Sequence, residues 1–466
     1  MTKIVVNPVT RISGFMQIEA TVENHTVTEA RTDGMLFRGF ELMLKGRSPL
    51  DAVYFTERIC GICSTAHAEA SSVALEQALG VVPREQGHYL RDITVGCDML
   101  QNHIRHFYQF VVPDYVKLPN IAPLFEGRGD YRLPEAMNHV IAKHYFDSLA
   151  MSRLAHTMTA VFGGKAPHTH GIYIGGVSMQ ATMEAIMQLK SMLNEMITFI
   201  ESSMLPDTYT IAQYYNDYFE IGKGYHALMT YGCFDGYRSL GTLYVDPKTY
   251  LNGEVRPLDP DGITESTEYA WYNGPEVYTP TEVIVQPDAK KTSAYSWVKA
   301  PRYFGNPMEV GPLARLWLAG EYNNGISTMD RIIARTLESR KIANILGTLV
   351  DNVIPGVVLQ SEYDVPEAGH GVGLVDTSRG ALGHWLKIEN KLLSFYQIIT
   401  PSAWNFSSEA GGIVGPAEKS LLGTVIADEN NPVELGRIVR SYDPCMSCAT
   451  HVHIPGRETK VWTVVP

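Results

Sequence analysis

The chain has 466 residues, of which 45% are hydrophobic and 19% are charged, as in ordinary globular proteins. Dividing the length by about 150 suggests roughly three domains, but a chain of this size can also form one subunit with a large core. The formal net charge is −12 and no run is rich in Lys and Arg, which argues against a surface for nucleic acid or anionic membranes.

Nothing in the chain predicts export or membrane insertion by itself. The segment from Met1 to Arg11 has no basic region followed by an apolar stretch, so we expect no signal peptide. No stretch of about 18 or more apolar residues predicts a transmembrane segment. We therefore expect a cytoplasmic protein. The alternative is a membrane-associated or periplasmic location, reached through a partner that carries the export signal.

Hydrophobic periodicity predicts an α+β fold that is mainly helical. Residues 1–35 alternate between apolar and polar, which predicts a small N-terminal antiparallel β unit. Residues 205–308 are rich in Gly, Pro, Tyr and Asp, which predicts an irregular, partly β insertion. Helical periodicity marks the segments 83–115, 133–162, 180–204, 312–354 and 382–398. We expect a central helical bundle with peripheral antiparallel β pieces.

Six cysteines are present, and four of them form two Cys-x-x-Cys pairs. The pairs are Cys60 with Cys63 and Cys445 with Cys448. A large chain without a secretion signal argues against a disulfide framework. Cys97 and Cys233 stand outside the pairs, and we interpret them as buried core thiols.

The spacing of the paired cysteines is that of metal ligands. Two pairs together can offer four sulfurs to one site, and only a tertiary fold can join pairs this far apart in the chain. A closed zinc site that holds the two ends together is the commoner use of such pairs, and a thiol–disulfide redox role is a third interpretation. Spacing alone does not choose between zinc and a softer redox metal.

The sequence resembles the large, catalytic subunits of nickel–iron hydrogenases. Both cysteine motifs look like the nickel-binding signatures of that family, and the likeness continues in order along nearly the whole chain. Further matching segments are 7–12, 37–41, 163–168, 295–303, 309–315, 378–385 and 401–405. The resemblance implies one large-subunit domain over residues 1–466 and an oxidoreductase that acts on H2.

The resemblance implies a dinuclear metal centre. Cys60 and Cys445 would be terminal thiolates on nickel, while Cys63 and Cys448 would bridge nickel to an iron that carries CO and cyanide. Thiolates are soft ligands that suit these redox metals. H2 would split heterolytically there, and the proton would go first to the thiolate of Cys445.

The resemblance also implies polar groups around the metals. The guanidinium of Arg379 would face the diatomic ligands, and Ser402 with the backbone at Thr400 would hydrogen-bond a cyanide. His67 would donate to a bridging sulfur. Without the resemblance, these would read as a surface arginine, helix-capping residues and a core histidine.

A second metal ion is implied near the C-terminus. Glu41, the carbonyl of Ile398 and His451 look like ligands of Mg2+ or iron, and such oxygen-rich sites suit hard cations. Taken alone, Glu41 would read as an exposed carboxylate at the start of a helix.

Two positions depart from the family pattern. Ser13 stands where the family has a glutamate that accepts protons, and a hydroxyl can relay a proton but cannot store one. Asn102 stands where many relatives carry an acidic residue. Asp443, just before the second cysteine pair, does match the family. The proton exit route is therefore expected to differ.

Residues 452–466 would be a C-terminal extension that is removed after nickel insertion, although 460–465 also read as an ordinary strand. Every cysteine suited to a cluster is already assigned to the metals, so we expect electrons to leave through an iron–sulfur small subunit that carries the clusters and to pass on to further electron-transfer subunits. Alternatives are a slow H2 sensor, a structural zinc protein, or a relative such as the quinone-site subunit of complex I.

Overall fold

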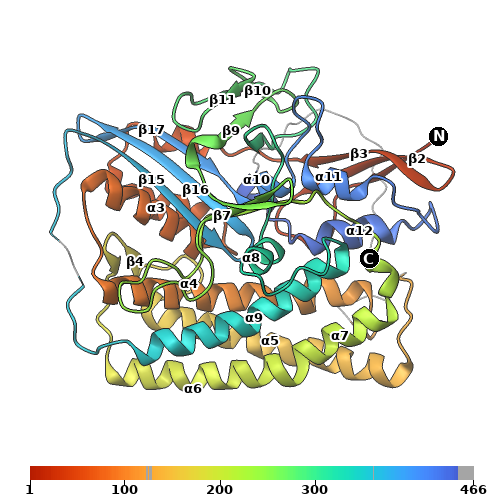
Figure 1. The fold of residues 1–466 in the computed structure, drawn as a ribbon, viewed down its shortest axis with the longest axis horizontal. Coiled ribbons are helices and arrows are strands. Elements are labelled where there is room, and N and C mark those ends of the chain that lie inside the picture. The colour runs from red at the N-terminus through yellow and green to blue at the C-terminus, as the bar shows by residue number, and fades with distance from the viewer. Residues whose placement is uncertain (122–123, 125–128, 360–361, 450–466) are drawn as a thin grey trace.

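The computed structural model describes residues 1–121, 124, 129–359 and 362–449, with only the backbone for 448 and 449. Long helices stack along one side of the molecule, and β structure lies on the other side (Figure 1). The bundle consists of α4 (Glu85–Arg105), α5 (Glu135–Gly163), α6 (Met183–Phe199), α7 (Leu205–Tyr214) and α9 (Thr328–Asp351). The mainly helical α+β class with a central bundle is thus confirmed.

The helix α9 begins at a well-formed cap and runs through the core of the bundle. Ser327 Oγ accepts a hydrogen bond from Asp330 N at 3.2 Å, and Asp330 Oδ2 accepts one from Ser327 N at 2.8 Å. Its buried face includes charged residues, Arg331, Arg335 and Glu338, among apolar ones. This placement brings ionised groups into the interior, where they need partners.

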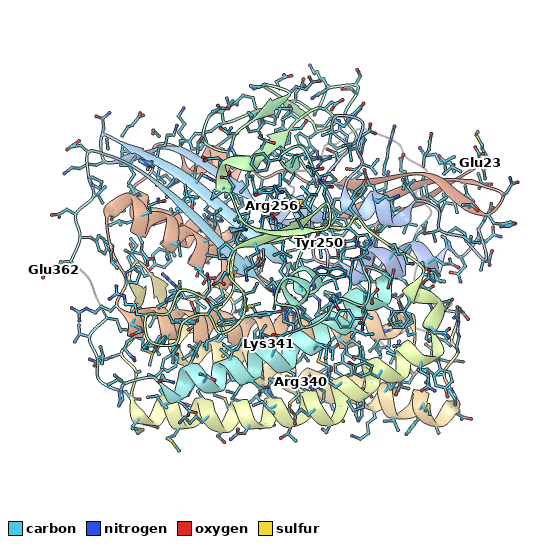
Figure 2. All side chains as sticks on the ribbon, in the orientation of Figure 1. Glu23, Tyr250, Arg256, Arg340, Lys341 and Glu362 are labelled. Atoms are coloured by element: carbon cyan, nitrogen blue, oxygen red, sulfur yellow. The ribbon has the colours of Figure 1, made fainter. Side chains whose placement is uncertain are left out.

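Shorter elements complete the helical part. They are α1 (Phe40–Leu44), α2 (Ala52–Thr56), α3 (Ser64–Leu79), α8 (Pro312–Leu318), α10 (Pro401–Asn405), α11 (Pro416–Leu421), α12 (Val433–Ser441) and α13 (Met446–Ala449). Two π-helical segments extend longer helices: His106–Val111 continues α4, and Ile200–Met204 joins α6 to α7. Side chains fill the space between bundle and sheets, and exposed charged residues such as Glu362 lie at the margin (Figure 2).

An antiparallel sheet of β15 (Ala368–Thr377), β16 (Gly380–Glu389) and β17 (Leu392–Ile399) carries α3 on one face (Figure 1). Two glycines of β15 permit this close packing. A Cβ at Gly371 would lie 1.9 Å from the Ala74 carbonyl oxygen, and one at Gly373 would lie 2.0 Å from that of Ala70. The helix backbone therefore rests directly on the strand, which places the start of α3 beside the end of β15.

The helix predicted over 382–398 is wrong, because β16 and β17 occupy this segment. Nearly every residue of β16 is buried, since its side chains enter two different core clusters. A strand covered on both faces lacks the alternation that identifies half-buried strands. Residues 205–214 also differ from the expected irregular insertion, because they form α7 as a continuation of α6.

The remaining β structure is peripheral. Residues 1–35 form a three-stranded sheet of β1 (Thr2–Val6), β2 (Met16–Glu23) and β3 (Thr26–Gly34). Short strands occupy the middle of the chain: β4 (Ile172–Tyr173), β5 (Gly176–Val177), β6 (Ala227–Thr230), β7 (Lys248–Leu251), β8 (Glu254–Pro257), β9 (Ile263–Ser266), β10 (Tyr272–Asn273), β11 (Val277–Tyr278), β12 (Gln286–Pro287), β13 (Ala300–Tyr303) and β14 (Glu309–Val310). Among the described residues, no helix is both long and apolar enough to cross a membrane.

Candidate metal centre

Three of the four motif cysteines converge in the interior. Cys60 follows a short 3-10 turn, Cys63 directly precedes α3, and Cys445 directly precedes α13. The Sγ atom of Cys445 lies 3.4 Å from that of Cys60 and 3.8 Å from that of Cys63, and all three side chains are buried. Cys448 lies on α13, and its side chain is outside the described residues. The two ends of the chain thus supply one thiol cluster that could hold a metal.

The N-terminal segment holds the second motif in place. Ser13 and Cys445 form a parallel β-bridge in which Ser13 N donates to the Pro444 carbonyl at 3.2 Å and Met446 N donates to the Ser13 carbonyl at 2.7 Å. Gly14 adopts a φ of 81°, and a Cβ there would lie 2.4 Å from Ser447 N. Only glycine fits this contact.

The hydroxyl of Ser13 lies directly against the thiols. Its Oγ atom is 3.5 Å from the Sγ atom of Cys445 and 3.9 Å from that of Cys60. It also lies 3.5 Å from the hydroxyl oxygen of Ser447. Ser13 is therefore placed to pass a proton from a thiol, but it carries no group that ionises near neutral pH.

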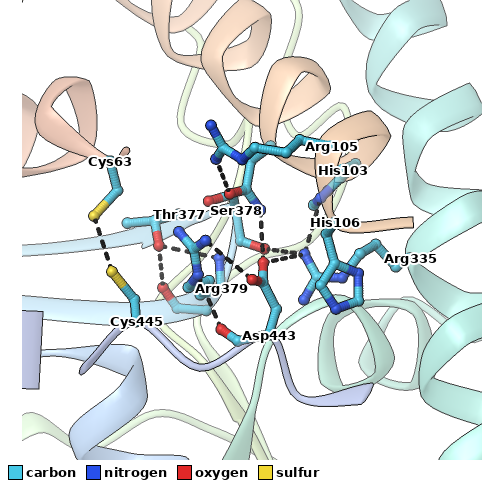
Figure 3. A network of polar contacts seen from close by, with 12 residues as sticks. Cys63, His103, Arg105, His106, Arg335, Thr377, Ser378, Arg379, Asp443 and Cys445 are labelled. Atoms are coloured by element: carbon cyan, nitrogen blue, oxygen red, sulfur yellow. Dashed lines mark hydrogen bonds and ion pairs between the residues drawn. The ribbon is translucent and has the colours of Figure 1, made fainter. Parts of the chain in front are cut away.

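Arg379 is fixed by Asp443 (Figure 3). Its Nε donates to the Asp443 carbonyl at 2.9 Å, and its Nη2 donates to Asp443 Oδ1 at 3.0 Å. Its Nη1 is buried and has no hydrogen-bond partner among the described residues. Such a donor normally has a partner. A polar ligand beside the cysteines would supply the missing acceptor.

Asp443 is the anion at the centre of a cationic cluster. Burial by itself raises its pKa, but the charges of Arg379 and Arg335 hold the pKa well below its ordinary value. Arg335 Nη1 lies 3.3 Å from Asp443 Oδ2. Asn102 donates to the same oxygen at 2.7 Å and accepts from Arg105 Nη2 at 2.8 Å. The neutral amide at position 102 thus links an arginine to the carboxylate.

The inner part of this network was not predicted from the sequence. Arg335 Nη1 donates to His103 Nδ1 at 2.9 Å, so neutral His103 carries its hydrogen on Nε2 and donates to Glu338 at 2.8 Å. Burial lowers the pKa of His103 to about 4, which keeps it neutral. Arg315 forms two bonds of 2.7 Å with Glu338. The sequence signal for this network is the charged stripe of α9, formed by Arg331, Arg335 and Glu338 at spacings of four and three residues.

Ser402 and Thr400 both cap backbone groups near the thiols. Ser402 Oγ accepts a hydrogen bond from Cys445 N at 2.9 Å, and Thr400 Oγ1 accepts one from Ala403 N at 3.2 Å at the start of α10. The structure therefore brings Ser402 to Cys445, as the expected site requires. A role of either residue toward a cyanide stays a prediction.

His67 begins a buried chain of hydrogen bonds. Its Nδ1 lies 3.1 Å from His384 Nε2, His384 Nδ1 lies 2.9 Å from the Tyr396 hydroxyl, and that hydroxyl lies 3.0 Å from Ser71 Oγ. If Tyr396 donates to Ser71, neutral His67 has no hydrogen on Nε2. If Ser71 donates to Tyr396, every bond reverses and Nε2 gains the N–H that donation to a sulfur requires.

Glu41 and Ile398 also meet. Glu41 Oε1 accepts from Ile398 N at 3.1 Å and from Lys299 Nζ at 3.3 Å, and Lys299 also lies 2.9 Å from Glu265 Oε2. Glu265 Oε1 and Gln397 Oε1 are buried acceptors without a partner among the described residues. Unused oxygens of this kind fit a hard cation and its water ligands. His451, the third expected ligand, lies outside the described residues.

Cys97 and Cys233 are buried, as predicted from the sequence. Burial raises the pKa of each thiol above its ordinary value. Buried thiols with a raised pKa are poor nucleophiles and poor metal ligands. Neither Cys97 nor Cys233 is therefore suited to a metal site.

Comparison with known proteins identifies the family. The sequence model described as nickel-dependent hydrogenase matches residues 38–124, 121–326 and 320–451. The periplasmic [NiFeSe] hydrogenase large subunit of Desulfomicrobium baculatum is 33% identical, with 97% of this chain and 95% of that protein covered. The uptake hydrogenase large subunit of Bradyrhizobium diazoefficiens is 30% identical over 97% of this chain and 96% of its own length.

Solved structures agree with these sequence matches. The Ni-Fe-Se hydrogenase from D. vulgaris Hildenborough in the reduced state superposes with a TM-score of 0.93 and 34% identity, covering 97% of this chain and 100% of that one. This chain has cysteine at all four positions of the two Cys-x-x-Cys motifs. The family match favours nickel over structural zinc for the cysteine cluster, and the chain belongs to the nickel-dependent hydrogenases as a large, catalytic subunit.

Proposed function

We propose that this chain catalyses the reversible heterolytic splitting of H2 at a nickel–iron centre held by Cys60, Cys63, Cys445 and Cys448, with CO and cyanide on the iron. The observation that carries the proposal is the convergence of three buried thiols beside the unpartnered Nη1 of Arg379. Soft thiolates suit the metals, and a fixed guanidinium suits small anionic ligands.

When bound, the centre supplies the Lewis acidity and the electron storage that H2 cleavage needs. Cys445 Sγ takes the released proton, because it is the thiol nearest to a second proton-handling group, Ser13 Oγ at 3.5 Å. Asp443 keeps Arg379 aimed at the thiols, and Ser402 orients the backbone of Cys445; Ser402 and the backbone at Thr400 would hydrogen-bond a cyanide of the bound centre.

Mg2+ is proposed for the second site, with Glu41, the Ile398 carbonyl and His451 as ligands. The unpartnered oxygens of Glu265 and Gln397 would then bind its water ligands. Because His451 immediately precedes residues 452–466, removal of that extension would leave the ligand near a new C-terminus. Cleavage after nickel insertion is therefore part of the proposal.

The names of the relatives support a partner and a location. They are large subunits or large chains, which supports pairing with an iron–sulfur small subunit that carries the electrons away. The name of the D. baculatum protein supports the periplasmic alternative over the cytoplasmic expectation, and the names hydrogenase-2 and uptake hydrogenase support an enzyme over a slow H2 sensor.

Metal content and turnover test this function directly. We would purify the chain with its natural partner and measure nickel and zinc per large subunit, H2-dependent dye reduction, and infrared bands of CO and cyanide. About one nickel, the diatomic bands and dye reduction are expected. Zinc without nickel, or nickel without H2-dependent reduction, would overturn the proposal.

Ser13 provides a second test. Ser13→Ala removes the hydroxyl that lies against Cys445, and we expect slower proton release without loss of nickel. Ser13→Glu restores the family's carboxylate, but Ser13 is only 5% exposed and packs against Ser447, so the longer side chain must displace neighbours. A several-fold gain in turnover by Ser13→Glu would show that the serine limits proton release.

A further inference from the structure

A cavity of about 630 Å³ lies beside the metal centre, between α3, α4, the loop 231–238 and the end of β15. Its inner wall includes Val73 and Val375, which also pack in the cluster formed by the motif cysteines. Its outer rim includes Val82 and Arg238, which are exposed. The cavity therefore extends from the layer of side chains around the thiols to the surface.

The walls of this cavity are acidic. The carboxyl groups that line it belong to Glu69, Glu76, Glu85, Asp92, Asp235 and Asp376. Basic lining groups are fewer: Arg91, Arg238 and His88. A net negative interior attracts protons and repels anions. The thiol cluster is the only group of ligands among the described residues that lies close enough together to hold a metal, so we do not assign a cation to the cavity.

Several of these acids have partners, whereas one oxygen of Glu69 has none within the described part of the chain. Glu76 pairs with Arg91 at 2.6 Å, and Asp92 pairs with His88 at 3.2 Å. Glu69 is 9% exposed, and its Oε2 atom is buried without a hydrogen-bond partner among the described residues. A buried carboxylate in this position is costly unless it binds water or a proton.

We propose that this cavity is the proton exit of the metal centre and that Glu69 is the group that stores the proton within it. This inference rests on the proposed function, because it assumes that H2 is split at the thiol cluster. Glu69 would perform the task that Ser13 cannot, since a carboxyl can hold a proton and then release it. The remaining acids and His88 would conduct the proton onward through water to the rim.

The groups facing Glu69 favour its protonated form. Burial raises the pKa of Glu69 well above its ordinary value, and Asp92 and Glu76 raise it further. Arg91 opposes them, and Asp235 in the loop adds to the negative field. Burial also raises the pKa of Asp235, to about 6, so the outer group gives up protons readily at neutral pH.

The helix that begins directly after Cys63 also carries Glu69, and it packs beside α4. The two helices pair in antiparallel order, since Glu76 near the end of α3 meets Arg91 near the start of α4, whereas Thr65 at the start of α3 donates to Asp98 farther along α4. Glu69 lies one helical turn after Thr65 on the same side of α3. Thr65 and Asp98 thus lie at the inner end of the line that leads to Glu69.

The proton balance requires no additional reactant. Each H2 yields two protons and two electrons, the electrons leave through the partner subunit, and each proton moves from the Cys445 thiol by way of the Ser13 hydroxyl and water to Glu69. Release from Glu69 to the outer acids and bulk water regenerates its carboxylate. No bond other than O–H and S–H forms or breaks along the route.

The test compares three variants of the purified complex. Glu69→Gln keeps the shape of the side chain but removes the ionisable group, and Glu69→Asp restores a carboxyl. Glu434→Gln is the matched control, because Glu434 on α12 is also buried and also has an unpartnered oxygen, but it lies outside the cavity. Nickel content, checked first, should equal that of the wild type in all three.

Three measurements are expected to change in Glu69→Gln only. Exchange of D2 with solvent protons and dye reduction should fall about tenfold or more, the scale of a lost proton-transfer group, while conversion of para-H2, which needs splitting but not exit, is retained. A carboxylic C=O infrared band that shifts in D2O should disappear, also in protein without metal. Glu69→Asp should recover most of the exchange.

The outcomes separate this inference from the proposed function. If the wild type is active and Glu69→Gln shows the same D2 exchange and the same C=O band, the proposed proton exit is overturned and the hydrogenase function stands. An equal loss in Glu434→Gln would also overturn it, because the effect would then come from removing any buried carboxyl. A wild-type complex that contains nickel but does not split H2 would instead overturn the proposed function.

Discussion

Replacing Asp443 by asparagine removes the anion that holds Arg379 beside the thiols. The carboxylate is 1% exposed and lies 3.0 Å from Arg379 Nη2 and 3.3 Å from Arg335 Nη1. Asparagine keeps the shape, but it leaves two buried guanidinium groups without this counter-charge. Breaking a buried ion pair by removing one partner costs about 3–5 kcal/mol.

That cost predicts a measurable change in melting temperature. An unfolding entropy of about 2.1 cal/mol/K per residue gives roughly 1 kcal/mol/K for a chain of 466 residues, so a loss of about 4 kcal/mol lowers Tm by about 4 °C. The folded pKa of Asp443 lies below its unfolded value, so its contribution is fully present at neutral pH and is lost as pH falls through the folded pKa. The loss of stability in Asp443→Asn, relative to the wild type, should therefore be largest at pH 7 and smallest in acid.

Asp114→Asn is the matched control for the charge effect. Asp114 is likewise buried between two arginines, with Arg11 at 2.6 Å and Arg440 at 2.7 Å, and their charges lower its pKa to about 2 although burial opposes this. Both variants should lower Tm in calorimetry of the complex. Only Asp443→Asn should also shift the CO and cyanide bands and slow dye reduction. Wild-type Tm and bands in Asp443→Asn would refute the reasoning.

Two further predictions concern the joined chain ends and a buried acid. Gly14→Ala should lower the nickel content, because its Cβ would strike Ser447 N. Gly46→Ala should leave the nickel content unchanged, because a Cβ there meets nothing within 4 Å. Equal nickel contents in the two variants would contradict the idea that Gly14 holds the second cysteine motif in place. Burial raises the pKa of Glu418 to about 7. The contribution of Glu418 to the free energy of unfolding therefore falls by up to about 3 kcal/mol as pH rises from about 4.5 to 7. Glu418→Gln should flatten that fall in unfolding measurements; an unchanged slope would exclude Glu418 as its source.

Elements with one exposed face were predictable from the sequence. The helix α5 has an exposed face, and its period identified it to within two residues at its start. The strand β16 was not predicted, because burial on both faces removes the alternation of apolar and polar residues. The continuation of α6 into α7 was not predicted either. Pro206 lies in the first turn of α7, where a missing N–H is tolerated, so the chain continues as helix.

The cysteines of the site were predictable as metal ligands, but the metal was not. Spacing left zinc open, and the resemblance along the chain, now supported by the family match, decided for nickel. Glu69 and Glu338 were not predicted, because a charged residue on a helix is usually solvated and only the fold shows that these two are buried. Their contacts come from segments far apart in the sequence.

The distribution of charge around the thiols provides a direction for proton movement. Arg379, Arg335 and Arg105 concentrate positive charge around the carboxylate of Asp443, whereas the cavity between α3 and α4 carries more acids than bases. A proton released near Arg379 is repelled by the guanidinium groups and attracted toward the cavity, so the field itself favours exit in that direction. A carboxylate at position 13 is then unnecessary, because the storage group lies along the field, at Glu69.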